Sequence, residues 1–99
     1  MFRGDTPSVN GFHVTAKGLV QGVGFRYFII STARELGLKG YVRNLPNGRE
    51  VEVAAEGDQE ALDSLLELIG IGPPGAEVDH LEVNWTDHPT GFSSFDLRR

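Results

Sequence analysis

The hydrophobic residues of this chain first form a regular pattern at Phe12. Hydrophobic or small residues occupy alternate positions from 12 to 18, with His13, Thr15 and Lys17 between them, as in a strand with one buried face. Glycines at positions 18, 22 and 24 end this strand. Hydrophobic residues then recur at helical spacing at positions 25, 28, 29, 33 and 36, and Gly37 follows as a stop. This part of the chain predicts a strand, a glycine-rich turn and an amphipathic helix.

The central segment predicts a hairpin and a second helix. The two strands cover residues 39–45 and 49–56, and Pro46-Asn47-Gly48 between them is a strong signal for a tight turn. Hydrophobic residues at positions 61, 62, 65, 66 and 69 then predict an amphipathic helix. Asp58 is suited to cap its start, and we expect Gly70 and the loop at residues 72–75 to stop it.

The C-terminal segment predicts two more strands. Leu81, Val83 and Trp85 alternate with polar residues, so we expect all three to point inward, with Trp85 in the core. Residues 94–98 predict a short edge strand. The complete order, βαββαβ plus a short strand, predicts the α+β class. We expect a ferredoxin-like split βαβ sandwich, with an antiparallel sheet and two helices on one of its faces.

Composition indicates an ordinary globular domain. The 99 residues are 39% hydrophobic and 23% charged, which favours one domain over residues 11–99. Residues 1–10 have the character of a flexible leader. They contain no hydrophobic stretch suited to secretion or membrane insertion, so we expect a cytoplasmic protein with no membrane partner. The chain has no cysteine, which excludes disulfides, thiolate nucleophiles and thiolate metal ligands.

Charge is distributed unevenly along the chain. The formal net charge of -5 argues against a nucleic-acid partner, and the strands offer chiefly acids and small residues outward rather than a basic, aromatic face for RNA. Residues 1–50 hold seven Lys or Arg and three acids (7 - 3 = +4), whereas residues 51–99 hold two and eleven (2 - 11 = -9). We therefore expect any anion site in the first half.

The strongest candidate for such a site is the turn before the first helix. Its residues are Val20-Gln21-Gly22-Val23-Gly24-Phe25-Arg26. Backbone N–H groups at a helix start lack intrahelical partners and bind anions, and the helix dipole adds positive potential. Glycines permit positive φ, and the arginine guanidinium can bind two phosphate oxygens. An ordinary turn with a solvent-facing arginine remains the alternative from these residues alone, and neither a Walker A nor a Rossmann motif is present.

The second candidate is Asn44, at the end of the strand that leads into the hairpin turn. An asparagine in this place commonly bonds to local backbone, and Asn47 is expected to be a turn residue only. If the strand of Asn44 lies beside the strand that precedes the glycine-rich turn, its amide faces that turn. The sequence leaves both interpretations open.

The remaining polar residues indicate no further site. His13, His80 and His88 share no ligand spacing and come with no clustered carboxylates, so we expect solvated histidines and no metal. The acids between positions 50 and 67 and between 77 and 87 are expected mostly on a solvated surface.

Two segments together resemble the signatures of a known family. Residues 18–26, Gly-Leu-Val-Gln-Gly-Val-Gly-Phe-Arg, and residues 40–48, Gly-Tyr-Val-Arg-Asn-Leu-Pro-Asn-Gly, are similar to the two signature segments of acylphosphatases. The resemblance extends from about Phe12 to Arg98. It implies an enzyme that hydrolyses the carboxyl-phosphate bond of acyl phosphates without a cofactor. Inorganic phosphate would be product and inhibitor, and we expect a monomer.

The resemblance also implies the site residues. Arg26 would bind the phosphate together with the loop amides of Gln21, Gly22, Val23, Gly24, Phe25 and Arg26, and Asn44 would orient the attacking water. The leaving group is a carboxylate whose conjugate acid has a pKa near 4.3. It needs no proton at neutral pH, so no general acid is required. Two alternatives stay open: a non-catalytic ferredoxin-like anion-binding or regulatory module, and a domain like the N-terminal module of hydrogenase-maturation carbamoyltransferases. The latter normally belongs to a longer chain with zinc-finger-like cysteines.

Overall fold

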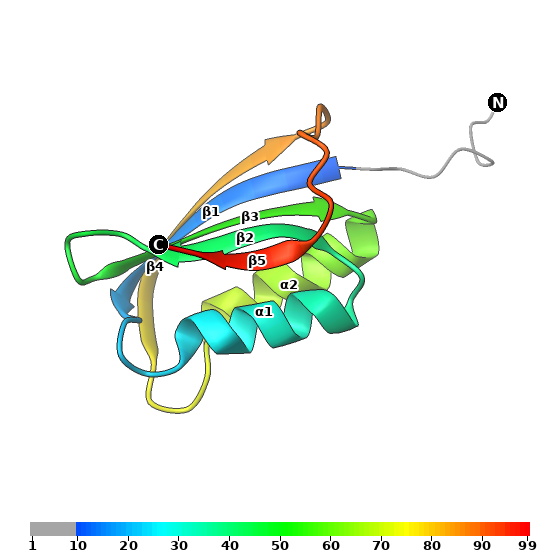
Figure 1. Cartoon of the computed structure of the whole chain (residues 1–99). Helices are drawn as coiled ribbons and strands as arrows, with labels where there is room; N and C mark the ends of the chain where they lie inside the picture. Colours follow the sequence, from blue (N-terminus) through cyan, green and yellow to red (C-terminus); the bar gives the residue numbers. More distant parts are fainter. Residues whose placement is uncertain (1–9) are drawn as a thin grey trace, which may run out of the picture.

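A computed structural model describes residues 10–99 as a five-stranded sheet with two helices beneath one face (Figure 1). The elements are β1 Asn10–Leu19, α1 Phe25–Glu35, β2 Lys39–Asn44, β3 Glu50–Gly57, α2 Gln59–Ile71, β4 Glu77–Thr86 and β5 Phe95–Arg98. The predicted ferredoxin-like α+β fold and the order of elements are confirmed. The predicted leader lies outside the described residues except for Asn10, the first residue of β1. No helix in residues 10–99 is long and apolar enough to span a membrane.

The sheet order is β4-β1-β3-β2-β5, and one pairing differs from expectation. β1 pairs antiparallel with β3 and β4, and β2 pairs antiparallel with β3. β5 pairs parallel with β2, so the prediction of a wholly antiparallel sheet is wrong at this edge. The cause is the path of residues 87–94, which cross the end of the sheet where β2 begins. β5 therefore starts beside the start of β2 and runs the same way.

The sequence left open whether the strand of Asn44 lies beside β1, and in the structure it does not. β3 lies between β1 and β2, because both of them pair with β3. Since β1 and β2 are each antiparallel to β3, they run in the same direction. Their C-terminal ends, and with them the glycine-rich turn and Asn44, lie at the same end of the sheet.

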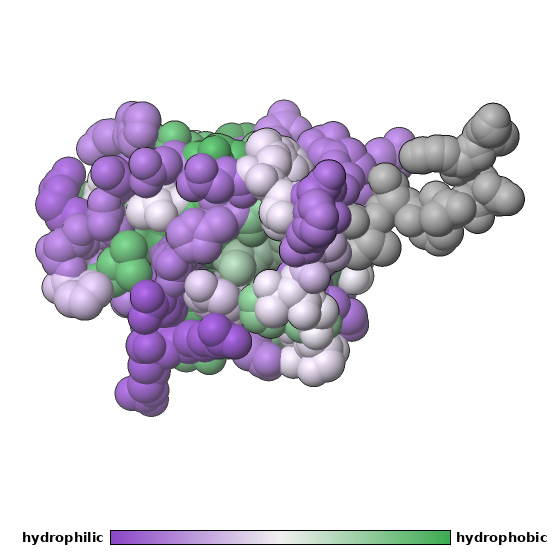
Figure 2. Space-filling model, turned by 90° about the horizontal axis from the view of Figure 1, so that it is seen from above, coloured by the Kyte–Doolittle hydropathy of each residue, from purple (hydrophilic) through white to green (hydrophobic). Residues whose placement is uncertain are grey.

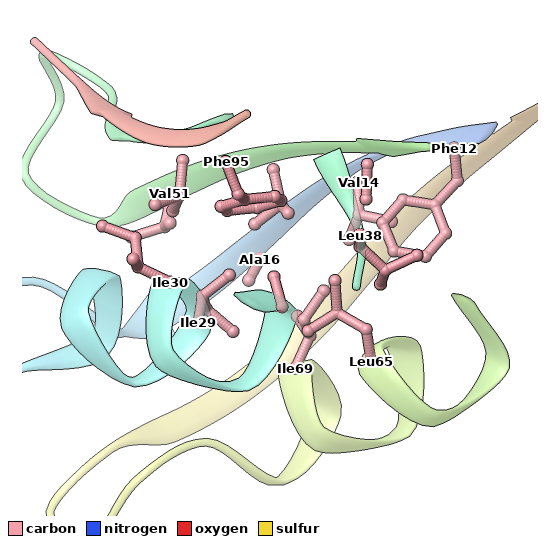
Figure 3. Close-up of a cluster of buried hydrophobic side chains, with 14 of the residues drawn as sticks. Phe12, Val14, Ala16, Ile29, Ile30, Leu38, Val51, Leu65, Ile69 and Phe95 are labelled. Carbon is pink, nitrogen blue, oxygen red and sulfur yellow. The ribbon is translucent and has the colours of Figure 1, made fainter. Parts of the chain in front are cut away.

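The core lies between the sheet and the helices, as the hydrophobic periodicities predict (Figure 3). The fully buried residues include Val14, Phe25, Ile29, Val53, Leu65 and Ile69. Trp85 is not in this core: it is 46% exposed and packs edge-to-face on Phe12. β4 is an edge strand, so no further strand covers its outer side.

The ends of α2 differ in detail from expectation. Asp58 is the N-cap residue, but its side chain makes no capping hydrogen bond. The helix continues through Gly70 to Ile71, and Gly72 with φ 72° is the C-cap. The left-handed conformation of Gly72 ends the helix, whereas Gly70 continues it.

The sheet face away from the helices is largely hydrophilic (Figure 2). Three of its basic residues bond to acids of β3: Arg43 Nε donates to Glu52 at 2.5 Å, His13 lies 2.6 Å from the same carboxylate, and Lys17 lies 3.3 Å from Glu50. Burial would raise the pKa of Glu52, but the bonds to Arg43 and His13 outweigh burial and hold the pKa below its usual value. The face is therefore richer in basic residues than the acids and small residues we expected.

Glu56 also departs from the solvated surface expected for the acids of this region. It is 7% exposed, because the loop between β4 and β5 covers it. Its carboxylate accepts N–H donors from Thr90, Gly91 and Phe92, the last two at 2.8 and 3.1 Å. A buried anion thus anchors the loop that leads to the parallel edge strand.

Candidate active site

The loop at residues 20–24 joins the end of β1 to the start of α1 and gives the site its shape. Gly22 has φ 78° and Gly24 has φ 77°, both in the left-handed region. A Cβ atom at either position would meet no heavy atom within 4 Å. Glycine is therefore needed here for the backbone conformation and not for space. The two left-handed residues turn the chain sharply into the helix.

The start of α1 presents free backbone donors. Phe28 N–H donates to Gly24 O at 3.0 Å, so the N–H groups of Phe25, Arg26 and Tyr27 have no acceptor one turn earlier. No acidic residue stands in the first turn to occupy them. These N–H groups and the helix dipole make the region attractive to an anion.

A small hollow of about 90 Å³ collects most of the predicted site residues. It is lined by Val20, Gly22, Gly24, Phe25, Arg26, Tyr27 and Asn44. The structure thus brings Arg26 of α1 and Asn44 of β2 to one place, although β3 lies between β2 and β1, the strand that leads into α1. Gln21 and Val23 do not line the hollow. Tyr27, which is 70% exposed, lines it and was not predicted from the sequence.

The side chain of Gln21 points to the hairpin instead. Its Nε2 donates to Leu45 O at 2.8 Å and to Glu50 O at 2.9 Å. Leu45 N–H donates to Glu50 O at 2.9 Å and closes the base of the hairpin at the same place. Gln21 was predicted only as a backbone amide, because a glutamine within a loop gives no sequence signal for the distant carbonyls that it reaches.

Asn44 carries a buried acceptor without a partner. Its Oδ1 is inaccessible and accepts no hydrogen bond from any described residue. Buried polar atoms are almost always paired, and leaving one unpaired costs about 1–3 kcal/mol. A side chain that only served the turn would bond to local backbone, as Asn47 does by accepting from Arg49 N–H at 2.9 Å. The turn-residue interpretation therefore suits Asn47 and not Asn44.

Arg26 is also without a protein partner in the part of the chain that the structure describes. The ion pairs of residues 10–99 involve His13, Lys17, Arg34, Arg43, Arg49 and His88. Arg26 is half-buried at the hollow and makes none of them. Its guanidinium is available to an anion there.

Two larger hollows lie near the N-terminal end of β1. One, of about 290 Å³, is lined by residues that include Gly11, Tyr41 and Phe92. The other, of about 580 Å³, is shallow and includes Asn10 and Trp85. Neither contains a residue of the predicted site. Within residues 10–99 no group of three or more His, Cys, Asp or Glu is arranged to hold a metal ion.

The fold and the hollow together define a small ferredoxin-like domain with a cradle, residues 21–26, whose free N–H donors lie at the end of its sheet. Comparison with known proteins narrows this class. The sequence model described as Acylphosphatase matches residues 12–97. An acylphosphatase of Dehalococcoides mccartyi (strain CBDB1) is 50% identical over 82 residues, which are 83% of this chain and 90% of the relative.

Solved structures agree with this result. The crystal structure of acylphosphatase from Bacillus subtilis superposes with a TM-score of 0.87 at 36% identity, covering 91% of this chain and 99% of that one. Full-length HypF in a phosphate- and nucleotide-bound form gives a TM-score of 0.83 at 25% identity, covering 98% of this chain but 13% of HypF. The chain belongs to the acylphosphatase family. It is thus an acylphosphatase-type enzyme, with an acyl phosphate as substrate and phosphate as product.

Proposed function

We propose that the hollow between α1 and β2 is the catalytic site, with Arg26 and the cradle amides holding the phosphoryl group and Asn44 orienting the attacking water. One observation carries this assignment. The start of α1 with its free N–H donors, Arg26 with its unpaired guanidinium, and Asn44, whose buried Oδ1 has no partner among the described residues, line the same small hollow. The three groups supply what an in-line attack on phosphorus requires.

The cradle binds the charged end of the substrate. The Arg26 guanidinium contacts two phosphoryl oxygens, and the N–H groups at the start of α1 contact the others. These donors stand in place before the substrate arrives, so they stabilise transition-state charge without reorganising. Because the hollow is lined chiefly by the cradle, recognition falls on the phosphoryl group and not on the acyl group.

Asn44 orients the nucleophile. The side-chain amide of Asn44 holds the water by hydrogen bonding, and a lone pair of the water oxygen stays free for phosphorus. An amide cannot remove the proton of the water, so a phosphoryl oxygen accepts it. The carboxylate leaves unprotonated because its pKa lies far below 7. The reaction needs neither a general acid nor a metal ion.

Other expectations from the sequence stay predictions. They are a monomeric state, a cytoplasmic location, inhibition by inorganic phosphate and the absence of a nucleic-acid partner.

The test is hydrolysis of benzoyl phosphate in the presence of a chelator. The wild type should be active, and Arg26→Ala and Asn44→Ala should each lose on the order of 10² to 10³ in turnover. The matched controls are Arg49→Ala, an exposed arginine paired with Asp79, and Asn47→Ala in the turn. Both controls should retain activity. Activity abolished by the chelator, or normal turnover of Asn44→Ala, would contradict the proposed mechanism.

A further inference from the structure

The side chain of Gln21 makes a bridge that the proposed mechanism does not use. Its Nε2 reaches two backbone carbonyls at the base of the hairpin, Leu45 O at 2.8 Å and Glu50 O at 2.9 Å. Both protons of the amide nitrogen are therefore engaged. Gln21 itself begins the cradle, and Leu45 directly follows Asn44. The bridge thus joins the loop proposed to hold phosphate to Leu45, the residue that follows Asn44.

We propose that Gln21 is a positioning residue that holds the phosphate cradle in register with Asn44, a role that rests on the proposed function. The sheet sets this register only indirectly, because Val51 of β3 pairs with both Ala16 of β1 and Asn44 of β2. β3 lies between β1 and β2, so no ladder of hydrogen bonds joins the strand before the cradle to the strand of Asn44. The bond between Gly18 N–H and Arg49 O connects the end of β1 only to the second side of the hairpin, just before β3.

Gln21 provides a direct hydrogen bond to the first side of the hairpin, at the residue that follows Asn44. Across residues 10–99, its bond to Leu45 O is the one hydrogen bond that joins residues 20–24 to residues 44–45. The same nitrogen also holds Glu50 O, which accepts the N–H of Leu45. One amide group therefore fixes both sides of the hairpin base relative to the cradle. Without it, the two halves of the site are connected only indirectly, through the pairing of β1 and β2 with β3, the bond from Gly18 N–H to Arg49 O, and packing.

Register matters because the water must stand in line behind phosphorus. A misplacement of about 1 Å in a catalytic geometry can cost about a hundredfold in rate. Phosphate binding has no such requirement, since Arg26 and the amides at the start of α1 belong to one continuous segment. Losing the bridge should therefore lower kcat by about tenfold to a hundredfold and change the inhibition constant of phosphate by less than about threefold.

The variant that tests this is Gln21→Met, which keeps the length of the side chain and removes both donors. Gln21→Ala is a second, smaller variant. Gln59→Met is the matched control, because Gln59 also makes side-chain hydrogen bonds, to Asn10 and Asp63, at the other end of the sheet. We expect the control to keep wild-type kcat. Each protein is measured for kcat on benzoyl phosphate, for phosphate inhibition and for Tm.

A double-mutant cycle with Asn44→Ala separates positioning from general support of the fold. If Gln21 acts by aligning the cradle with Asn44, then Gln21→Met should cost less than about threefold in the Asn44→Ala background, because no oriented water remains to misalign. A merely structural role would give the same loss in both backgrounds.

Three other outcomes would contradict the positioning role of Gln21. An active wild type with unchanged kcat in Gln21→Met and Gln21→Ala would overturn the positioning role alone. Equal losses of phosphate affinity and kcat would show that Gln21 orders the cradle itself. A wild type without any hydrolysis would overturn the proposed function and this inference with it.

Discussion

Removal of the Asn44 side chain should affect activity and stability in opposite directions. Asn44→Ala takes away a carbonyl oxygen that is buried and has no partner among the described residues. Ordinary buried side chains support the fold, so that their loss lowers the free energy of unfolding. An unpaired buried acceptor does the reverse, because its desolvation is not compensated by a hydrogen bond.

The burial of the unpaired oxygen sets the expected change in the free energy of unfolding, and the proposed role of Asn44 sets the expected change in turnover. The unpaired oxygen costs about 1–3 kcal/mol, and the packing contacts of the amide, which alanine loses, offset part of that cost. We therefore expect the free energy of unfolding of Asn44→Ala to lie between the wild-type value and about 1 kcal/mol above it. Turnover should fall on the order of 10² to 10³, as for loss of one preorganised hydrogen-bonding group.

The measurement is urea unfolding followed by circular dichroism in phosphate-free buffer, together with benzoyl phosphate hydrolysis. Val42→Ala is the matched control: it lies on the same strand and is completely buried. It removes two carbons from the core and should lower the free energy of unfolding by about 2–3 kcal/mol. Its activity should persist wherever it is folded. Asn44→Ala should thus lose activity but keep its stability, whereas Val42→Ala should lose stability but keep its activity.

Two results would refute this reasoning. A loss of more than about 1.5 kcal/mol in Asn44→Ala would mean that the side chain supports the fold, since such a loss matches a broken network and not a relieved acceptor. Wild-type turnover in the same variant would remove Asn44 from the mechanism.

Further predictions concern binding, pH and loop anchoring. Phosphate at a hundred times its Kd should stabilise the wild type by about 2.7 kcal/mol, and a thermal melt of Arg26→Ala should show no such protection; protection that persists would place the anion elsewhere. Because the folded pKa of Glu52 is lowered, its contribution to stability is present above the unfolded pKa and is lost as pH falls through the folded value. Urea midpoints from pH 7 to 3 should therefore fall less steeply in Glu52→Gln, and an unchanged slope would contradict the pairing with Arg43 and His13. Glu56→Ala should lose about 2–4 kcal/mol on urea unfolding, because three N–H groups lose a charged acceptor; wild-type stability would show that the loop at residues 90–92 holds without it. Turnover should stay nearly flat from about pH 5 to 8, and a histidine-like limb would contradict a base-free mechanism.

The local elements of the fold could be predicted because neighbouring residues determine them. The alternation after Phe12, the helical spacing after Phe25 and the Asn47-Gly48 turn all gave elements of the right type in the right place. The errors occurred where a distant segment decides the outcome. Trp85 has the pattern of an inward residue, but it stands on an edge strand and remains half-exposed. Glu56 has the pattern of a surface acid, and a loop more than thirty residues away buries it.

The candidate site also has one part that neighbouring residues determine and one part that strand order determines. The cradle is a local structure: the glycines at 22 and 24 adopt positive φ, and α1 starts directly after them with its first N–H groups unpaired. Asn44 was assigned to the site through the resemblance to acylphosphatases, and the adjacency to β1 that would have brought it there is not observed. It nevertheless lines the hollow, because β1 and β2 run in the same direction and end at the same side of the sheet.

The sequence by itself determined the glycine-rich turn before α1, the order of the elements and, through its two signature segments, the family. These properties depend on residues close together in the chain or on a fixed string of them. Only the tertiary structure decided which strand separates the two halves of the site, that Asn44 Oδ1 is buried without a partner, and that Gln21 connects the halves. Those properties depend on strand order and on contacts across 24 or more residues of chain, which long-range packing selects and local propensity does not specify.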